Sequence, residues 1–358
     1  MIEKSEIVLV GPYRPPVGGV ATHVERLSKA CLSKGYKCCV LDIFADKKAD
    51  APVWVQRLGG CSWIRGVKAF LWLSKCNAST IHFHVASMDR FHIAGWPMLL
   101  ATLGAQTRII TIHGGTFVQK CRRKGRLFCA YIGALLRCFD AVIAVNEEQV
   151  GFLVRALQVD ESKVHMIPAY IPASAPDVNT IFPKAIREMM QGRRIVLGSG
   201  QATRTYGHDI LMRAVEKQGI RDDLLLIIAL YSTRDTEYLD MLEKARTGMH
   251  NCIFVYDLPP EVFASLLTEA DVYVRPTYVD GDSVTVREAL AQGCCVIASD
   301  CIDRPEGVNT FKSGCHESLS DCLQKALRFQ TGCGTNMKQQ RNFSHDVMLL
   351  YKRLIGSG

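Results

Sequence analysis

The chain has 358 residues, of which 48% are hydrophobic and 22% charged, the balance of a soluble globular protein, and it has no fixed-period repeat. This length predicts two domains, each able to bury a core. The first apolar run, in "EIVLVG", is too short for a signal peptide, and no run reaches the roughly 18 apolar residues of a spanning helix. The sequence therefore predicts a cytoplasmic protein.

The formal net charge of +8 is unevenly distributed along the chain. Residues 1–173 carry 22 basic and 12 acidic side chains, a net charge of +10, whereas residues 174–358 carry 21 basic and 23 acidic side chains. A positive first half favours nucleic acid, an anionic membrane or a phosphorylated substrate as partner. The 15 cysteines include no Cys-x-x-Cys pair, so we interpret them as reduced, mostly buried thiols.

In the first half, buried strands alternate with amphipathic helices. "EIVLVG" predicts a parallel strand, and a Pro/Gly loop and the helical pattern "VATHVERLSKACLSKG" follow it. Further strands are predicted at "KCCVLDIF", "TIHFHVAS", "RIITIHGG" and "AVIAVN". This order predicts a doubly wound α/β domain over residues 1–168.

A proline-rich stretch over residues 169–192 predicts an interdomain linker. The alternation then resumes with "IVLGSG", "DLLLIIALY", "CIFVYDLP", "DVYVRPT" and "CCVIASD", which predicts a second Rossmann-like domain over residues 193–335. Residues 336–358 end in an amphipathic helix that we expect to return toward the first domain. Two such domains should place the carboxyl ends of both sheets across a ligand-binding cleft.

The segment "RPTYVDGDSVTVREALAQG" concentrates acidic side chains around Gly281. In one interpretation, Asp280 and Asp282 clamp a divalent cation that carries a nucleotide diphosphate, because hard cations take carboxylate oxygens. In the other, the glycine turn opens a helix whose N–H groups bind phosphate, and the carboxylates face sugar hydroxyls.

The residues after Gly281 favour the second interpretation. If Asp282 or Ser283 caps the helix, "VTVREALAQ" fills it and the next glycine ends it. The N–H groups of Ser283 and Val284 would then face phosphate, and Glu288 would be placed to accept hydrogen bonds from ribose hydroxyls. An ordinary exposed glutamate is the alternative for Glu288.

Four segments resemble, in this order, the retaining glycosyltransferases of family 4, which have the GT-B fold: "GPYRPPVGGVATHVERL", "TIHGG", "KVHMIPAYIP" and "YVDGDSVTVREALAQGCCVIASD". The resemblance extends over nearly the whole chain. It implies a nucleotide diphosphate sugar as donor, with UDP-sugars the most frequent in the family, and no required cofactor or metal. The family has a Glu-x7-Glu motif at this place. Here Asp280 stands at its first position, which implies a contact with the donor sugar, and Glu288 stands at its second position, which implies a contact with the ribose.

Two features of the first half fit this resemblance. Gly18 and Gly19 follow the first strand and precede a helix, so their backbone can approach the diphosphate, although a purely structural turn remains the alternative. His113, at the end of a strand, matches the family's active-site histidine and is expected near the transferred sugar. His82 and His84 alternate on one strand face without a further metal-ligand set, and we treat His84 as a weaker candidate for the cleft.

The resemblance fails where the family has an Arg and a Lys that neutralise the diphosphate. Gln201 and Tyr206 stand at those positions in "GSGQATRTYGHDILMRAV". The leaving diphosphate still needs positive charge. Arg204 is the first candidate and Arg275 the second, and for both an ordinary surface or sheet-edge arginine is the alternative.

Basic side chains also gather shortly after His113. These five candidates for an anionic acceptor or for lipid headgroups are Lys120, Arg122, Arg123, Lys124 and Arg126. A solvated charge run is the alternative. The pattern "SWIRGVKAFLWLSKC" predicts either a membrane-surface helix or a helix packed on the first sheet.

Taken together, the sequence predicts a retaining GT-B glycosyltransferase of the hexosyl or N-acetylhexosaminyl type, acting in surface polysaccharide synthesis. We expect a lipid-linked glycan acceptor, no nucleic acid, and a cytoplasmic location, peripheral at the inner face of the cell membrane. No nucleophile is evident, so the resemblance implies that the leaving diphosphate acts as base and that the two domains close. The alternatives are a nucleotide-sugar epimerase, a metal-dependent transferase, and an inactive GT-B binding subunit.

Overall fold

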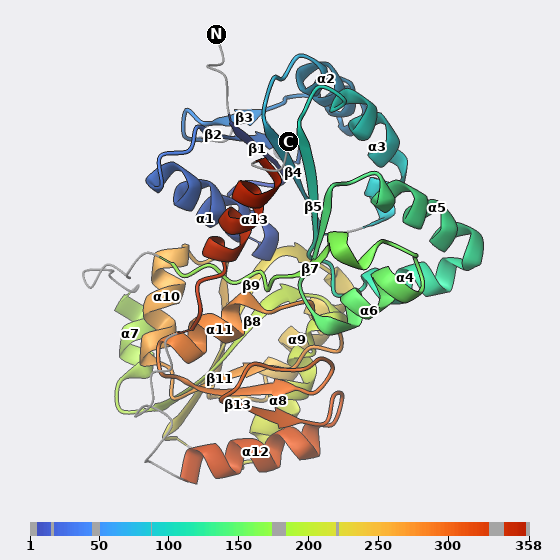
Figure 1. Ribbon diagram of the computed structural model, residues 1–358. Coiled ribbons are helices and arrows are strands. Elements are labelled where there is room, and N and C mark those ends of the chain that lie inside the picture. Colours follow the sequence, from blue (N-terminus) through green and yellow to red (C-terminus); the bar gives the residue numbers. More distant parts are fainter. Residues whose placement is uncertain are drawn as a thin grey trace. The chain divides into compact units, whose positions relative to one another are not determined.

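The computed structural model describes residues 6–15, 18–44, 51–86, 88–173, 184–219, 222–328 and 340–355 (Figure 1). The chain divides into two compact units. Unit 1 comprises Met1–Ile171 together with Asn342–Gly358, and unit 2 comprises Pro172–Arg341. Of the predicted linker, residues 174–183 lie outside the described part of the chain.

Unit 1 contains a seven-stranded sheet with the order β3-β2-β1-β4-β5-β6-β7. All its strand pairs are parallel. Its strands are β1 (Ile7–Val10), β2 (Cys38–Asp42), β3 (Val55–Arg57), β4 (Thr80–Val85), β5 (Thr107–Ile112), β6 (Ala141–Ala144) and β7 (Val164–Met166). The order reverses between β1 and β4, which makes this pair the switch point where ligands of doubly wound sheets bind.

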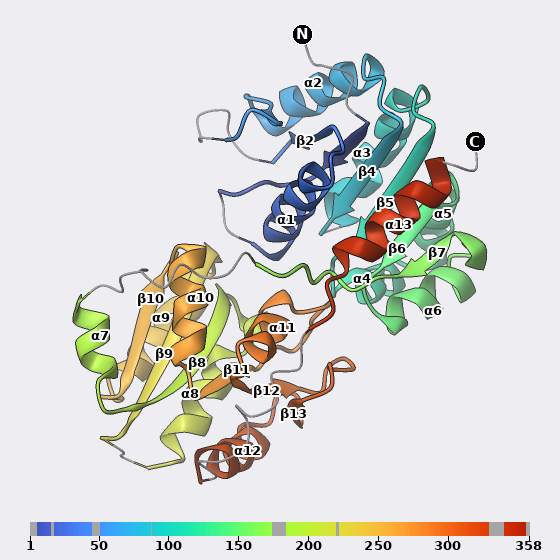
Figure 2. The ribbon, with the colours of Figure 1, turned by 60° about the vertical axis from the view of Figure 1, so that its left-hand side comes forward.

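Successive residues of β1 point to opposite faces of this sheet, and each face has its own core. Ile7 and Leu9 pack against α1 (Gly19–Ser33) and α13 (Ser344–Ile355), whereas Val8 and Val10 pack on the opposite side. The C-terminal helix α13 lies beside α1 and extends over β5 and β6 (Figure 2). The opposite face carries α2 (Ser62–Ser74), α3 (Met88–Ala101), α4 (Phe117–Lys124), α5 (Arg126–Arg137) and α6 (Glu147–Arg155), and the short 3-10 turn η1 (Glu161–Lys163) precedes β7.

Unit 2 contains a six-stranded parallel sheet with the order β10-β9-β8-β11-β12-β13. Its strands are β8 (Arg194–Ala202), β9 (Leu224–Arg234), β10 (Cys252–Tyr256), β11 (Val272–Arg275), β12 (Cys295–Ser299) and β13 (Val308–Phe311). Here the switch point lies between β8 and β11. Both sheets therefore repeat the same Rossmann-like winding, which confirms the predicted fold class.

The helices of unit 2 also cover both faces of their sheet. One face packs against α8 (His208–Glu216), α9 (Thr236–Arg246) and α12 (His316–Arg328). The other packs against α7 (Lys184–Met190), α10 (Pro260–Glu269) and α11 (Val284–Ala291). The 3-10 turn η2 (Arg204–Tyr206) leads into α8.

The strands that the sequence pattern missed are β3, β7 and β13, of three or four residues. All three lie at the edges of their sheets, and each contains only one or two apolar residues, so the hydrophobic pattern is too short to predict a strand. The basic residues after His113 lie on helix α4 and at the start of α5. Among the described helices, none combines the length and apolar character needed to cross a bilayer.

Candidate active site

The switch point of unit 2 brings together the loop after β8 and the loop after β11. The Tyr278 N–H donates to the Thr205 carbonyl oxygen at 2.9 Å and ties the two loops. Gly207 has φ +64°, and a Cβ added to it would meet the Pro276 carbonyl oxygen at 2.1 Å. Only glycine fits this left-handed, crowded position, so Gly207 allows the two loops to touch.

The acidic segment opens α11 as predicted. Ser283 is the cap, since its Oγ accepts from the Val286 N–H at 3.4 Å, and Gly293, with φ +77°, follows the end of the helix. Glu288 lies half-buried one turn after Val284. Asp282 does not cap the helix; its Oδ1 accepts from Arg287 Nε at 2.8 Å.

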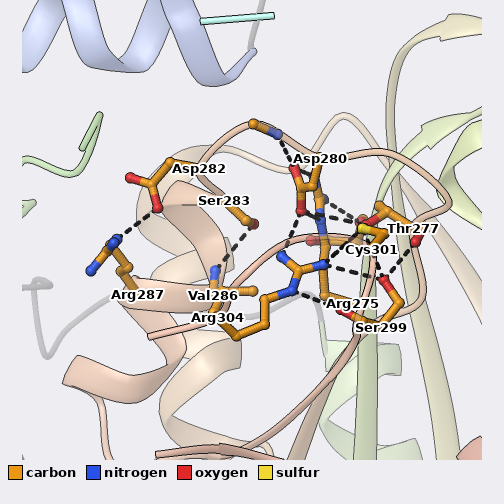
Figure 3. Close-up of polar contacts among 12 residues, drawn as sticks. Arg275, Thr277, Asp280, Asp282, Ser283, Val286, Arg287, Ser299, Cys301 and Arg304 are labelled. Atoms are coloured by element: carbon orange, nitrogen blue, oxygen red, sulfur yellow. Dashed lines mark hydrogen bonds and ion pairs between the residues drawn. The ribbon is translucent and has the colours of Figure 1, made fainter. Parts of the chain in front are cut away.

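Asp280 lies at the centre of a buried ion-pair cluster (Figure 3). Arg275 donates to both of its carboxylate oxygens, at 3.1 and 3.2 Å, and Arg304 donates to Oδ2 at 3.0 Å. The Gly281 N–H and the Thr277 hydroxyl add contacts of 3.2 and 3.4 Å. Burial alone would raise the pKa of Asp280, but the two guanidinium groups outweigh it and lower this pKa to about 2.

Arg304 is a residue of this site that the sequence pattern missed. It follows β12, and its side chain is only 2% exposed. Besides Asp280 it donates to the Ser299 carbonyl and contacts Thr277. The order of the strands could have indicated Arg304 as a site residue. Because β12 pairs with β11, the loops after these two strands meet at one edge of the sheet.

The two candidate cations for the diphosphate have different surroundings. The Arg275 guanidinium is held by Asp280, by the Ser199 carbonyl oxygen at 3.3 Å, and above the Tyr206 ring at 4.9 Å. Arg204 is exposed, and its guanidinium contacts Glu237 at 3.4 Å and the Tyr238 ring. A cavity of about 340 Å³ adjoins it, lined by Arg204, Thr205, Asp209, Tyr278 and Val279.

Gln201 and Tyr206, which replace the family's basic pair, have structural contacts. The Gln201 carbonyl oxygen faces His208 Nε2 at 3.1 Å, and the Tyr206 ring stacks on the His208 ring at 6.0 Å. Gly200 makes room for Tyr206, because a Cβ there would lie 2.0 Å from its ring. These two residues therefore shape the loop after β8.

In unit 1, three histidines meet at the switch point of the sheet. His84 is the last but one residue of β4, His113 follows β5, and His23 comes from α1. His84 Nδ1 and His113 Nε2 are 3.1 Å apart, and the His23 ring centroid lies 4.8 Å from that of His113. His23 is the second site residue that the sequence analysis missed. Its position one turn after Gly19 could have indicated that it lies at the same edge of the sheet.

All of these histidines are held in the neutral form. Burial lowers the pKa of His23 to about 4, and burial together with the neighbouring histidines lowers the pKa values of His84 and His113 well below their usual range. His82 is engaged elsewhere: its Nδ1 faces the Tyr351 hydroxyl at 2.6 Å and its Nε2 faces Thr111 Oγ1 at 2.7 Å. His82 therefore connects β4 to α13.

The glycines of the first loop lie at the start of α1. Gly18 is the N-cap residue and Gly19 the first helical residue. Apart from the chain neighbours and the backbone of α1, no atom of the described residues lies within 4 Å of a Cβ built on either glycine. The described residues thus leave space at the start of α1, as an anion site there requires.

The basic residues of α4 and α5 lie next to exposed apolar side chains. Arg122, Arg123, Lys124 and Arg126 are exposed, and Lys120 is half-buried. Helix α2, which contacts α3, exposes the apolar residues that the sequence pattern singled out, and α5 exposes two more. These side chains are Trp63, Val67, Phe70, Leu71, Leu127 and Tyr131.

The chain has the GT-B fold of glycosyltransferases. Residues 17–174 match the model "Glycosyltransferase Family 4" and residues 183–321 match the model "Glycosyl transferases group 1". Together the two models cover most of the chain, and both describe glycosyltransferases.

Solved structures with the same fold include sucrose-phosphate synthase from Thermosynechococcus elongatus, at 18% identity and a TM-score of 0.77, covering 99% of this chain and 100% of that one. HepE from Anabaena, solved in complex with UDP, matches at 12% identity and a TM-score of 0.72 over 99% and 100% of the two chains. WaaG, a glycosyltransferase involved in lipopolysaccharide biosynthesis, matches at 14% identity and a TM-score of 0.68 over 98% of each chain. No curated protein sequence matches this chain.

Proposed function

We propose that this glycosyltransferase retains the anomeric configuration and moves a hexosyl or N-acetylhexosaminyl group from a nucleotide diphosphate sugar to a lipid-linked glycan. The geometry at the start of α11 is the observation that supports binding of the nucleotide diphosphate sugar. Ser283 caps the helix, the N–H groups of Ser283 and Val284 open it, and Glu288 follows one turn later on the adjoining face. This arrangement suits a phosphate at the helix N-terminus and a ribose hydroxyl pair at the carboxylate. HepE, which has the same fold, was solved with UDP and with UDP-glucose.

Arg204 is the side chain that we propose for the diphosphate. Its side chain is 63% exposed and its partner Glu237 is 88% exposed, so a ligand phosphate can replace that contact at little cost. Arg275 is a poorer candidate because Asp280 and the Tyr206 ring already hold its guanidinium. We propose that Arg275 positions Asp280 and the turn at Gly281.

The ion pairs around the acidic segment support metal-independent donor binding. Both oxygens of Asp280 accept hydrogen bonds from arginine, and Asp282 is paired with Arg287. A divalent cation bridged by these two carboxylates would have to displace three guanidinium groups. Full transferase activity in excess EDTA is the expected result, and a loss that Mg²⁺ or Mn²⁺ restores would favour the metal-dependent alternative.

The surface of unit 1 supports an acceptor at an anionic membrane. Helices α2 and α5 expose apolar side chains, and α4 and α5 add basic ones. Apolar side chains beside Lys and Arg are the combination that binds the interface of anionic lipids. We propose that this face holds the enzyme at the inner leaflet, where a lipid-linked acceptor would be available for surface polysaccharide synthesis.

A thermal-shift screen of UDP, GDP, ADP and CMP with their sugars tests the donor proposal, because a bound ligand raises stability by mass action. Glu288→Gln should weaken the stabilising donor at least about tenfold, since a charged acceptor contributes about 1.5–3 kcal/mol. Glu261→Gln, an exposed glutamate on α10, is the matched control.

Three outcomes would contradict the proposal. If no nucleotide stabilises the chain, the donor assignment fails. If Glu288→Gln binds the donor as tightly as the unchanged chain, the ribose role fails. If the donor binds and neither transfer nor donor hydrolysis occurs with any acceptor, the inactive binding subunit is the better description.

A further inference from the structure

We propose that His23, His84 and His113 form a binding site for one divalent transition metal ion, with Zn²⁺ the best fit. One ring nitrogen from each of the three residues lies within 4.8 Å of the other two. The residues come from α1, from the end of β4 and from the loop after β5, so only the folded unit brings them together.

The spacing of the three nitrogens suits a small metal ion. His84 Nδ1 and His113 Nε2 are 3.1 Å apart. Two nitrogens bound to tetrahedral Zn²⁺ at about 2.0–2.1 Å lie about 3.3 Å from each other. A metal ion between this pair therefore needs almost no change in their separation. His23 supplies the third nitrogen, which lies within 4.8 Å of the other two.

Hydrogen bonding prepares His23 to be a ligand. His23 Nδ1 lies 2.6 Å from the Ala169 carbonyl oxygen, which can only accept, so Nδ1 carries the proton and Nε2 the lone pair. The ring is 4% exposed, and its Nε2 has no hydrogen-bond partner within the described part of the chain. A carbonyl that fixes the tautomer of a buried imidazole is the usual support of a metal-binding histidine.

His84 is 2% exposed, and its ligand nitrogen is Nδ1, the atom that faces His113 Nε2. A bound ion replaces the hydrogen bond between these two nitrogens. The unpaired buried atom that the ion explains is His23 Nε2. The neighbouring His82 is excluded as a ligand, because the hydroxyls of Tyr351 and Thr111 engage both of its nitrogens.

The ligand set points to the type of metal. Three neutral imidazoles without a carboxylate favour Zn²⁺, Co²⁺, Ni²⁺ or Cu²⁺ over Mg²⁺, Ca²⁺ or Mn²⁺. Three histidines leave a fourth tetrahedral position open for water or an oxygen ligand. His113 is half-buried, so that position can face the side from which ligands reach the sheet edge.

Occupation of this site has a consequence that rests on the proposed function. If His113 lies near the transferred sugar, an ion bound to its Nε2 competes with that role. Zn²⁺ should therefore inhibit transfer, and the concentration that halves the rate should match the dissociation constant of the ion.

Binding is tested first, without reference to activity, by competition of the full-length chain with a chromophoric chelator for Zn²⁺ and by the visible spectrum of Co²⁺. We expect one ion per chain. His23→Asn keeps an N–H donor near the Ala169 carbonyl but removes Nε2, and His113→Gln changes the half-buried ligand. Each should weaken binding more than about tenfold, because losing a ligand outweighs the 10- to 100-fold effect of losing its outer hydrogen-bond partner.

His250→Gln, an exposed histidine of unit 2, is the matched control and should bind Zn²⁺ as the unchanged chain does. Circular dichroism verifies that each variant folds. Equal affinity in the unchanged chain and in the His23→Asn/His113→Gln double variant would overturn the proposal, as would the absence of any bound ion.

The two proposals can fail separately. A chain that binds Zn²⁺ through the three histidines but never transfers sugar contradicts the proposed function and leaves the metal site intact. A chain that transfers sugar and binds no Zn²⁺ contradicts only the metal site. If Zn²⁺ binds but does not inhibit transfer, the proposal that the ion and the transferred sugar compete for His113 is wrong.

Discussion

Arg304 Nη1 donates to Asp280 Oδ2 at 3.0 Å, and the two side chains are only 2% and 8% exposed. This contact joins the loop after β12 to the loop after β11 at the carboxyl edge of the sheet in unit 2. Arg275 approaches the same carboxylate from the end of its own strand. Asp280 thus forms ion pairs with two buried arginines, and it stands immediately before the turn that opens α11.

Removing Arg304 should destabilise unit 2 strongly. Breaking one partner of a buried ion pair typically costs about 3–5 kcal/mol, and Arg304→Met retains most of the side-chain volume while removing the charge. Arg204→Met is the control, because its exposed pair with Glu237 should contribute at most about 1 kcal/mol. Urea unfolding measures both, and similar small effects for the two variants would show that the buried pair contributes little.

Gly207→Ala should separate the two loops at the switch point of unit 2. A left-handed non-glycine residue costs about 1–2 kcal/mol, and the clash of the new Cβ with the Pro276 carbonyl adds about 1–3 kcal/mol. Gly219 has a similar φ of +82°, and no other described residue comes within 4 Å of a Cβ added there, so Gly219→Ala measures the cost of the left-handed backbone alone. We expect Gly207→Ala to be the more destabilising variant in urea and to weaken donor binding, and equal costs would contradict the clash.

His208 should make unit 2 less stable in mild acid. Burial lowers its pKa to about 4 from the usual 6.5. Between these two values the unfolded chain binds the proton and the folded chain does not, so stability is full above about pH 6.5 and falls as the pH drops toward 4, by on the order of 3 kcal/mol.

His208→Gln removes this titration and keeps an amide N–H donor for the Gln201 carbonyl. The difference in unfolding free energy between the unchanged chain and this variant should therefore change between pH 7 and pH 4. A difference that stays constant over this range would mean that His208 titrates equally in the folded and unfolded chains.

The exposed apolar face of α2 should attach the enzyme to anionic vesicles. Trp63 and Leu71 are 77% and 51% exposed, and the Trp63→Ser/Leu71→Ser variant should lose most of its flotation with such vesicles at low salt. Leu349→Ser, on α13 of the same unit and 49% exposed, is the control and should float normally. Failure of the unchanged chain to float would remove the membrane part of the proposal.

The sequence predicted the fold because its strands are long apolar runs separated by helical patterns and glycine turns. Strands such as β5 and β9 are buried on both sides, so their hydrophobic pattern is unambiguous, whereas β3 and β7 are short edge strands with few apolar residues. The cap and end of α11 were also predictable, since Ser283 and Gly293 act through local backbone geometry. The roles of the site residues in the reaction stay predictions.

Only the tertiary structure decided which charged groups meet. Local sequence determined that Asp280 stands in a glycine turn before a helix, but the arginine that buries it, Arg304, lies 24 residues further along the chain. In the same way, His23 and His113 are brought to His84 by the parallel packing of strands and helix. Helix caps and helix hydrogen bonds depend on near neighbours in the sequence, whereas ion pairs and ligand sets depend on which strand ends share a sheet edge.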